Sequence, residues 1–400
     1  MRQVYRLFAA VLAAAVTAAM APALYLQETL PDRFSISPGG ESVLASQYPY
    51  IHWSSPPTTD TLSVYGSNSE TLDSTSELRL LGLVKIKDVS LHPVQPKEVA
   101  LCGTPFGIKM CTDGVIVVGT GSIPTENGPV NPAKRAGIVE GDRLLAINGH
   151  TALSNSLIAQ LVRQSEGQAL TVRYIREETE KTTVITPALS TADGQYHIGL
   201  WVRDSSAGIG TLTCCDPTTG EFIGLGHAIC DVDTGQLMPI SNGQVVKATI
   251  NGSTPGTPGQ PGELQGSILS SQPWGILTEN RSSGVYGRLN SDWQNFPLIY
   301  TAHSSEVTTG PAQILCTISG TEPCYYDVEI ERIHSIDDPE GRNLVLRITD
   351  PDLLKETGGI LQGMSGSPII QNGKLAAAVT HVFINDPSRG YGIFIENMLN

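Results

Sequence analysis

Glycine and proline are spread through most of the chain, and this distribution constrains its fold more than any other feature. The 400 residues include 41 glycines and 26 prolines. Because these residues interrupt helices and central strands, few stretches remain that are able to form a long helix. Short apolar or alternating runs separated by turns are typical of sheet proteins, so we expect a mainly β architecture.

The composition is that of a folded protein with room for two or three domains. Hydrophobic residues make up 40% of the chain and charged residues 16%, which is typical of globular proteins. A formal net charge of −14 argues against a broad nucleic-acid-binding surface. The seven cysteines form no C-x-x-C pair, so a structural zinc site has little support, and we expect neither a metal nor an organic cofactor.

The N-terminus has the pattern of an export signal or a membrane anchor. Arg2 and Arg6 precede a charge-free run from Leu7 to Leu26, which is long enough to span a bilayer. Positive charge before such a run directs the rest of the chain across the membrane. We predict a signal or anchor segment at 1–34 and a linker or approach segment at 35–97. Cleavage after Ala23 and retention as an anchor both remain open.

Residues 98–188 form a second unit, which contains the pattern A-G-I-x-x-G-D-x-L-L-x-I-N-G at 136–149. Its last two residues, Asn148-Gly149, predict a hairpin turn between two apolar segments. This pattern resembles the PDZ domains of bacterial peptidases, which are α+β modules that bind an extended peptide along a sheet edge. The resemblance implies a capture loop near 103–107, with Phe106, Gly107 and Ile108 as peptide-binding residues. A PDZ fold that serves only for packing is the alternative.

The strongest chemical signal is Gly363-Met364-Ser365-Gly366-Ser367-Pro368. A serine attacks a carbonyl when it is held in a tight exposed turn beside a base, with backbone amides directed at the developing oxyanion. The nucleophile elbow of α/β-hydrolases requires glycine where Ser367 stands. The strand–turn–strand that follows instead resembles the second barrel of chymotrypsin-like peptidases. That resemblance implies an oxyanion hole at the amides of Gly363 and Ser365, in a double β-barrel domain at 189–400.

The general base and its orienting acid are less clearly marked. His227 lies in a glycine-flanked apolar segment before the serine, and His381 is its rival. Asp350 precedes a proline and a short helical run, a pattern that also predicts a helix N-cap. Asp231 and Asp233 are alternative acids close to His227.

Two long stretches resemble the stage IV sporulation protein B peptidase family. They are I-G-L-W-V-R-D-S-S-A-G-I-G-T-L-T at 198–213 and L-x-I-T-D-P-x-L-L-x-x-T-G-G-I-x-Q-G-M-S-G-S-P-I-I-Q-N-G-K at 346–374. The resemblance implies a catalytic triad of His227, Asp350 and Ser365 in an exported, membrane-associated serine endopeptidase.

The same resemblance implies a signalling role in sporulation. The enzyme would be secreted from the forespore into the space between the two sporulation membranes and cut a membrane-bound regulator there. That cleavage would relieve the inhibition of an intramembrane metalloprotease, which would then process a sigma factor precursor. The expected partners are therefore this membrane-bound protein substrate and the enzyme's own N-terminal segment, which it would cleave itself.

Two other functions are weighed against this one. Envelope quality-control peptidases of the HtrA type place the PDZ module after the peptidase domain, whereas here the PDZ-like pattern comes first. A non-catalytic PDZ scaffold does not need the intact serine motif at 363–368.

Overall fold

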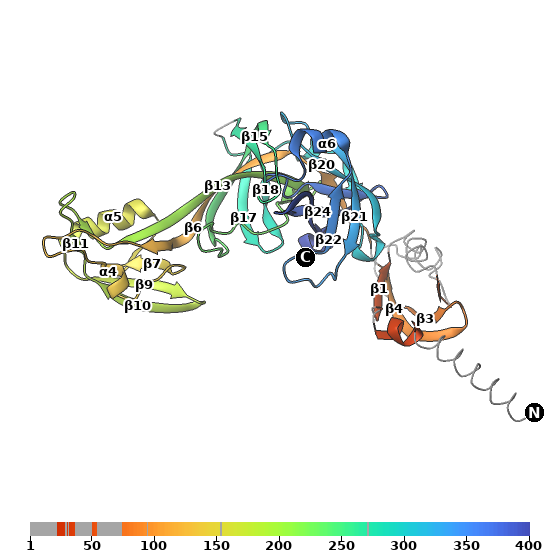
Figure 1. Ribbon diagram of the computed structural model, residues 1–400, viewed down its shortest axis with the longest axis horizontal. Coiled ribbons are helices and arrows are strands. Elements are labelled where there is room, and N and C mark those ends of the chain that lie inside the picture. Colours follow the sequence, from red (N-terminus) through yellow and green to blue (C-terminus); the bar gives the residue numbers. More distant parts are fainter. Residues whose placement is uncertain are drawn as a thin grey trace, which may run out of the picture.

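The computed structural model describes residues 22–28, 30, 32–36, 50–53, 74–93, 95–152, 154–269 and 272–400. Most of the apolar run from Leu7 to Leu26 lies outside these ranges, so its predicted role as a signal or anchor stays a prediction. Within the described ranges, no helix combines the length and the apolar character needed to cross a membrane. The described chain has three parts in a row: a small N-terminal sheet, a pair of β-barrels and a PDZ module (Figure 1).

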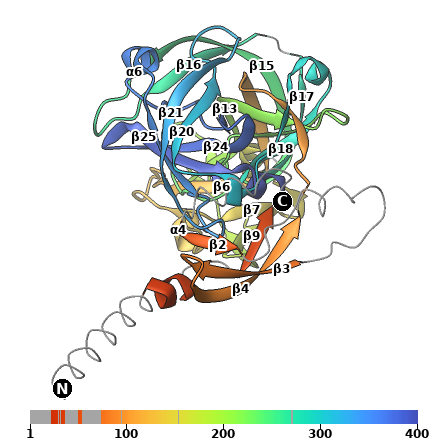
Figure 2. The same cartoon turned by 90° about the vertical axis from the view of Figure 1, so that its right-hand side faces the viewer.

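The N-terminal part is a four-stranded sheet with the order β1-β4-β3-β2. Leu78, Ile86 and Val89 are buried in its core. The sequence predicted a linker over 35–97, but the described part of this range includes ordered strands that close a core of their own. Figure 2 shows this sheet below the barrels. Its strands are β1 (Arg33–Ile36), β2 (Ile51–Trp53), β3 (Ser74–Leu80) and β4 (Val84–Pro93).

The first barrel is closed by a strand that pairs on both of its edges. Strand β6 pairs with β15 on one side and with β13 on the other, which completes a ring of six strands. Phe106, Leu212 and Phe222 fill the core. Its strands are β6 (Pro105–Thr120), β13 (Leu200–Cys215), β14 (Glu221–Gly224), β15 (Ile240–Thr254), β17 (Gly275–Arg281) and β18 (Gly284–Leu289), with β5 (Glu98–Leu101), β16 (Glu263–Ile268), β19 (Leu298–Tyr300) and the short helices η1 (Trp293–Asn295) and η2 (Ser304–Glu306) beside them.

The second barrel is also closed and has six strands, in the order β20-β21-β22-β25-β24-β23. Ile314, Leu346 and Val379 lie in its core. The two barrels confirm the expected mainly β architecture. The strands are β20 (Gly310–Cys316), β21 (Cys324–Ile333), β22 (Leu344–Ile348), β23 (Pro368–Gln371), β24 (Lys374–Phe383) and β25 (Asp386–Phe394), and the helices are α6 (Pro351–Thr357) and α7 (Ile395–Leu399).

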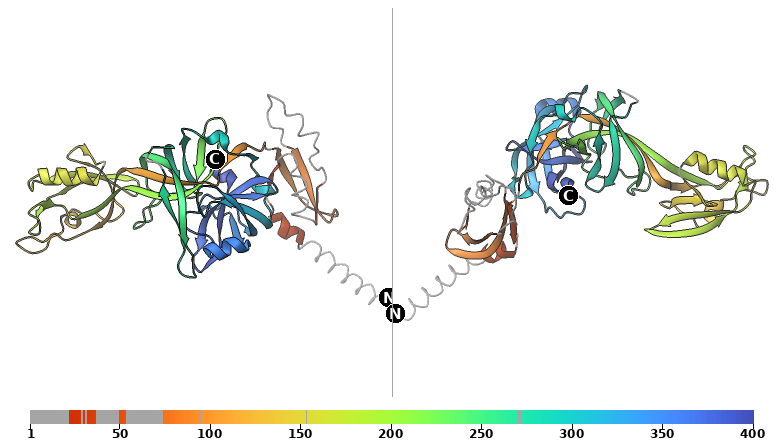
Figure 3. Two further views of the ribbon diagram at one scale, coloured as in Figure 1. Left: turned by 90° about the horizontal axis from the view of Figure 1, so that it is seen from above. Right: turned by 180° about the vertical axis from the view of Figure 1, so that it is seen from behind.

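The PDZ module is inserted into the first barrel, between two of its strands. Strands β6 and β13 each have 16 residues, or about 50 Å at the usual rise per residue, so each serves both domains. The predicted division at 98 and 189 is therefore wrong: β5 and the first half of β6 belong to the barrel, and the start of β13 belongs to the PDZ module. Figure 3 shows the module at the far end of this ribbon. Its other elements are α4 (Pro132–Arg135), β7 (Arg143–Ile147), β8 (His150–Thr151), α5 (Asn155–Gln164), β9 (Leu170–Arg176), β10 (Thr179–Ile185), β11 (Ala188–Leu189) and β12 (Tyr196–His197).

The residues of the PDZ sequence pattern have clear structural roles. Asn148 and Gly149 have φ angles of 48° and 80°, which two-residue hairpin turns require, and they connect β7 to β8 as predicted. Asp142 is fully buried and accepts two hydrogen bonds of 2.6 Å from Arg176. It also accepts one of 2.9 Å from the amide of Val139. This carboxylate therefore ties the turn before β7 to the end of β9.

We expect Asp142→Ala to destabilise the PDZ module by about 2 kcal/mol, because the Arg176 guanidinium and the Val139 amide would both lose a partner. Hydrogen exchange of β7 and β9 measures the loss. The matched control is Asp113→Ala. The Asp113 side chain is 60% exposed and lies 3.0 Å from Arg143, and exposed ion pairs of this kind contribute little to stability. Equal effects of the two substitutions would contradict the role given to Asp142.

Candidate active site

A cavity of about 640 Å³ lies where the two barrels meet. The first barrel contributes residues of β13 and the segment after β14, and the second contributes the serine loop and β24. Among the predicted site residues, the structure places Ser365, Gly363, His227 and His381 in the lining of this one cavity. Asp350, Asp231 and Asp233 are not among the residues that line it.

The serine loop is a tight turn that only glycine permits. Gly363 and Gly366 have φ angles of 98° and 94°, in the region that side chains disfavour. A Cβ atom on Gly366 would lie 2.1 Å from the carbonyl oxygen of Thr211. The Ser365 hydroxyl donates a 2.6 Å hydrogen bond to the carbonyl of Thr380. Ser365 is thus held at the cavity wall by backbone geometry.

Two amides of this loop are available for an oxyanion. The carbonyl of Gln362 accepts from the amide of Leu264 at 2.8 Å, and the carbonyl of Met364 accepts from Ser367 at 3.0 Å. Since C=O and N–H point in opposite directions across a trans peptide, these bonds turn the Gly363 and Ser365 amides away from Leu264 and Ser367. Neither amide donates a hydrogen bond to another residue in the described ranges. This arrangement supports the predicted oxyanion hole.

His227 follows a strained turn and has the tautomer that a general base needs. Leu225 and Gly226 both have positive φ angles, of 66° and 72°. The Nδ1 atom of His227 lies 2.8 Å from the carbonyl oxygen of Ala228. A carbonyl oxygen only accepts hydrogen bonds, so Nδ1 carries the proton and Nε2 is left with a free lone pair. Burial lowers the pKa of His227, which keeps the ring neutral at pH 7.

His381, the rival base, packs against His227. The ring centroids are 4.7 Å apart, with an angle of 35° between the planes. Burial, followed by the charges of His227 and Arg342, lowers the pKa of His381 to about 4. Of the two rings, His227 has its tautomer fixed by the Ala228 carbonyl, which leaves Nε2 to accept a proton, so His227 is better suited to the role of base.

Asp350 is the N-cap of helix α6, as the alternative reading of its sequence predicted. One carboxylate oxygen accepts from the amides of Asp352 and Leu353, both at 3.0 Å. The other accepts from the amide of Asp327 at 3.4 Å. No hydrogen bond connects Asp350 to His227 in the described part of the chain. Its role as the orienting acid therefore stays a prediction that this geometry does not support.

Asp231 and Asp233 hold the segment after His227. Both form ion pairs with Arg203 of β13, and Asp231 also accepts from the amide of Thr234. The group that contacts Nδ1 of His227 is the Ala228 carbonyl, which sequence reasoning missed because every residue except proline offers the same backbone groups. Within the described ranges, no cluster of three or more His, Cys, Asp or Glu side chains is arranged to hold a metal ion.

The predicted peptide-binding residues of the PDZ module are misplaced. Gly107 pairs with Val246 of β15 and with Ile209 of β13, so β6 has no free edge there. Phe106 and Ile108 are buried in the core of the first barrel, and Ile108 also lines the cavity that holds Ser365. The prediction of a peptide site at Phe106, Gly107 and Ile108 is therefore wrong.

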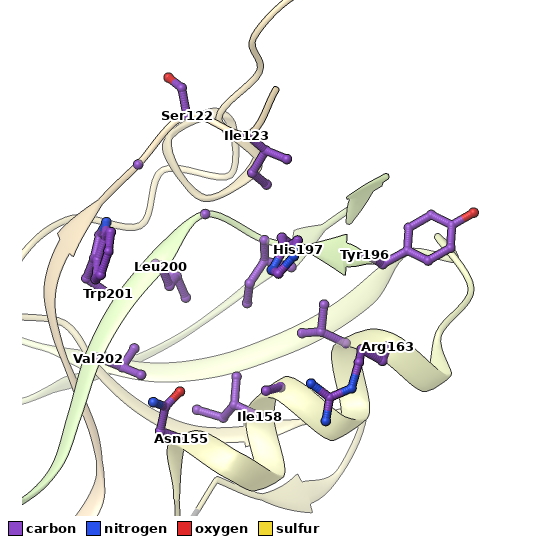
Figure 4. A pocket seen from close by; sticks show the side chains of 15 residues that line it. Ser122, Ile123, Asn155, Ile158, Arg163, Tyr196, His197, Leu200, Trp201 and Val202 are labelled. Atoms are coloured by element: carbon purple, nitrogen blue, oxygen red, sulfur yellow. The ribbon is translucent and has the colours of Figure 1, made fainter. Parts of the chain in front are cut away.

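A groove of about 320 Å³ lies instead between α5 and the start of β13. In Figure 4, Ile158 and Arg163 of the helix face Leu200 and Val202 of the strand. The apolar-Gly-apolar signature expected of a capture loop occurs here, at Ile198-Gly199-Leu200, and Gly199 has a φ of 74°. This signature was the available signal, and it lies about 95 residues after the capture loop predicted at 103–107.

Two closed barrels and a glycine-flanked serine that shares a cavity with a neutral histidine define a serine endopeptidase. The family model named SpoIVB peptidase S55 matches residues 194–399. The match covers just over half of the chain, and the chain belongs to this family. A PDZ domain model matches residues 129–176. No curated protein sequence matches the chain.

Two solved structures are similar to parts of the chain. The PDZ domain of the SdrC-like protein from Listeria monocytogenes is 21% identical, with 22% of this chain and 87% of that domain covered and a TM-score of 0.18. The HtrA-type protease AlgW, solved with a decapeptide, is 11% identical, with a TM-score of 0.30. That match covers 49% of this chain and 52% of AlgW, so this chain spans about half of AlgW.

We expect kcat/KM to fall with decreasing pH only below 6.5. His227 must be neutral to accept a proton. Because burial lowers its pKa, the ring stays neutral at pH values below the ordinary histidine pKa of 6.5, and activity is lost as the pH falls through the lowered pKa. The pH–rate profile measures this.

His227→Phe should reduce kcat at least about 10³-fold, because the general base is lost. His381→Phe, which keeps a ring at the stacking position, should stay within about tenfold; the reverse result would make His381 the base.

Asp350→Ala should lower the melting temperature by about 2–4 °C, because a lost N-cap costs about 1 kcal/mol. Asp350→Ser keeps a capping oxygen and removes the carboxylate, so we expect it to restore most of the stability and to leave specific activity intact. Calorimetry and peptidase assays on the same samples check both. A folded Asp350→Ser enzyme that loses about 10⁴-fold in activity would assign the orienting role to the carboxylate.

Proposed function

We propose that this protein is a sporulation signalling peptidase that cuts a membrane-bound regulator outside the cytoplasm and processes its own N-terminal region. The observation that carries the proposal is the serine loop, with its two available amides, beside the neutral His227 in a chain of the SpoIVB peptidase family. Cleavage of the regulator would activate intramembrane processing of a sigma factor precursor.

The chemistry follows from the site. The Ser365 hydroxyl rotates from the Thr380 carbonyl toward Nε2 of His227, gives up its proton and attacks the peptide carbonyl. His227 then returns the proton to the leaving amine. The amides of Gly363 and Ser365 stabilise the oxyanion. The Ala228 carbonyl fixes the tautomer of His227, a task that serine peptidases usually give to a carboxylate.

The cavity favours apolar side chains next to the scissile bond. The lining residues include Ile209, Ile360, Leu361, Val382 and Ile384, and none of those identified in the described ranges is Asp, Glu, Lys or Arg. A charged side chain would lose its water here without gaining a partner, which costs several kcal/mol in a low-dielectric site. We therefore expect cleavage beside aliphatic residues.

The groove between α5 and β13 supports peptide binding by the PDZ module. From Leu200 to Arg203, β13 pairs with β6 along one edge only, so its other edge is unpaired within the described residues. An extended peptide could add there as a further strand, with apolar side chains against Ile158 and Val202. The substrate and the enzyme's own N-terminal segment are the proposed peptides.

Export and release complete the proposal. The apolar run from Leu7 to Leu26 would anchor the enzyme at the membrane, facing the space around the forespore. A tethered segment is present at high effective concentration, so even a weakly preferred bond in it is cut. Cleavage within the approach segment would free the enzyme from its anchor.

The test is the mature N-terminus. Wild type expressed with its full N-terminal segment should yield ends between 27 and 76, whereas Ser365→Ala should keep a longer chain, which N-terminal sequencing measures. The matched control is Ser367→Ala, which removes the neighbouring buried hydroxyl of the same loop. This variant should process like wild type. Identical ends in wild type and Ser365→Ala would refute self-cleavage.

A further inference from the structure

The serine loop is fastened to the first barrel by two threonines of β13. The hydroxyl of Thr211 donates to the carbonyl of Gly363 at 2.9 Å, and its amide donates to the carbonyl of Ser365 at 3.0 Å. The hydroxyl of Thr213 donates to the carbonyl of Gly366 at 2.7 Å. Thr211 is 3% exposed and Thr213 is fully buried, so water does not easily replace these bonds.

The two bonds from Thr211 lie on either side of the peptide that matters for catalysis. They fix the Gly363–Met364 and Ser365–Gly366 peptides. Between these lies the Met364–Ser365 peptide, whose N–H is one of the two predicted oxyanion donors. With its two neighbours fixed, this peptide has little freedom to rotate. The glycines of the loop supply no side chain to restrain it, so hydrogen bonds supply the restraint. Thr211 makes two of them, beside the bond from the Ser367 amide to the Met364 carbonyl.

Thr211 also contacts the segment that carries the base. Its carbonyl accepts a hydrogen bond of 3.3 Å from the amide of Leu225, two residues before His227. One residue of the first barrel is therefore hydrogen-bonded both to the nucleophile loop of the second barrel and to the turn before His227. The nucleophile and the base lie on different barrels, and Thr211 connects the two across the interface.

We propose that Thr211 is a positioning residue that holds Ser365 and its oxyanion-binding amide in register with His227. Loss of its hydroxyl leaves the Gly363 carbonyl buried without a donor and frees the loop to shift. A shift of the amide weakens the interaction with the transition state more than with the bound substrate. The proposal rests on Ser365 being the nucleophile.

The experiment compares Thr211→Val, which keeps the shape and removes the donor, with Thr211→Ser, which restores the donor. The readouts are kcat and KM on fluorogenic casein, the rate of labelling by a fluorophosphonate, and the melting temperature. Since removal of a whole oxyanion donor costs about 10²–10³ in kcat, a displaced one should cost about 10–100-fold. We expect that loss of kcat in Thr211→Val, with KM within twofold and Thr211→Ser within threefold of wild type.

The matched control is Thr112→Val in β6. The Thr112 hydroxyl is also buried and donates to a carbonyl, that of Gly114 at 2.6 Å, but it does not contact the serine loop. The Thr112→Val variant should lose about as much stability as Thr211→Val and keep the wild-type kcat. If Thr211→Val does not fold, Thr211→Ala replaces it, because the smaller side chain removes the donor without placing a methyl group against the Gly363 carbonyl.

Three results separate the outcomes. Unchanged kcat in folded Thr211→Val or Thr211→Ala, or an equal loss in Thr112→Val, would overturn the role of Thr211. Slow labelling of Thr211→Val that Thr211→Ser restores would support it. Failure of the wild-type enzyme to react with the fluorophosphonate at Ser365 would instead remove the nucleophile assignment on which the proposal rests.

Discussion

The antiparallel pairing of β6 with β13 is the interaction on which the rest of the structure depends. It runs from Pro105 opposite Thr211 to Thr120 opposite Leu200. Its inner half closes the first barrel and lines the cavity, and its outer half is part of the PDZ sheet. Because backbone hydrogen bonds along such a ribbon form and break cooperatively, the position of each domain is tied to the other through β-structure rather than through a linker.

The electrostatics of the site are unusual in that, among the residues that the structure describes, no carboxylate hydrogen-bonds to His227. Burial and the Ala228 carbonyl are enough to give a neutral ring with Nε2 free, but they stabilise the protonated ring less than a carboxylate would. The imidazolium formed during catalysis is then held mainly by the dipole of one carbonyl. Such a site favours modest turnover.

The sequence predicted the parts whose signals are local. The turn at Asn148-Gly149, the cap at Asp350 and the clustering of Ser365 with His227 follow from short patterns, and the structure shows each of them. The domain boundary was missed because a strand shared by two domains has no break in its pattern. Gly114, with a φ of 82° in the middle of β6, looks in sequence like a turn but is accommodated within a continuous strand. Whether the chain turns at Gly114 or continues as a strand is decided by the strands that pair with β6, and no local sequence pattern indicates this pairing.

The insertion of the PDZ module has a consequence for how the barrel forms. Cys111 and Ser205 are directly opposite each other on β6 and β13, at the point where the ribbon leaves the barrel. In topological terms, the whole module takes the place of the turn of a β-hairpin. Two neighbouring strands of the barrel are thus separated by more than ninety residues of chain, counted from 111 to 205, and joining them from the unfolded state costs loop-closure entropy. Once the PDZ module has folded, its own sheet brings the two strands together, which lowers the loop-closure cost of completing the first barrel.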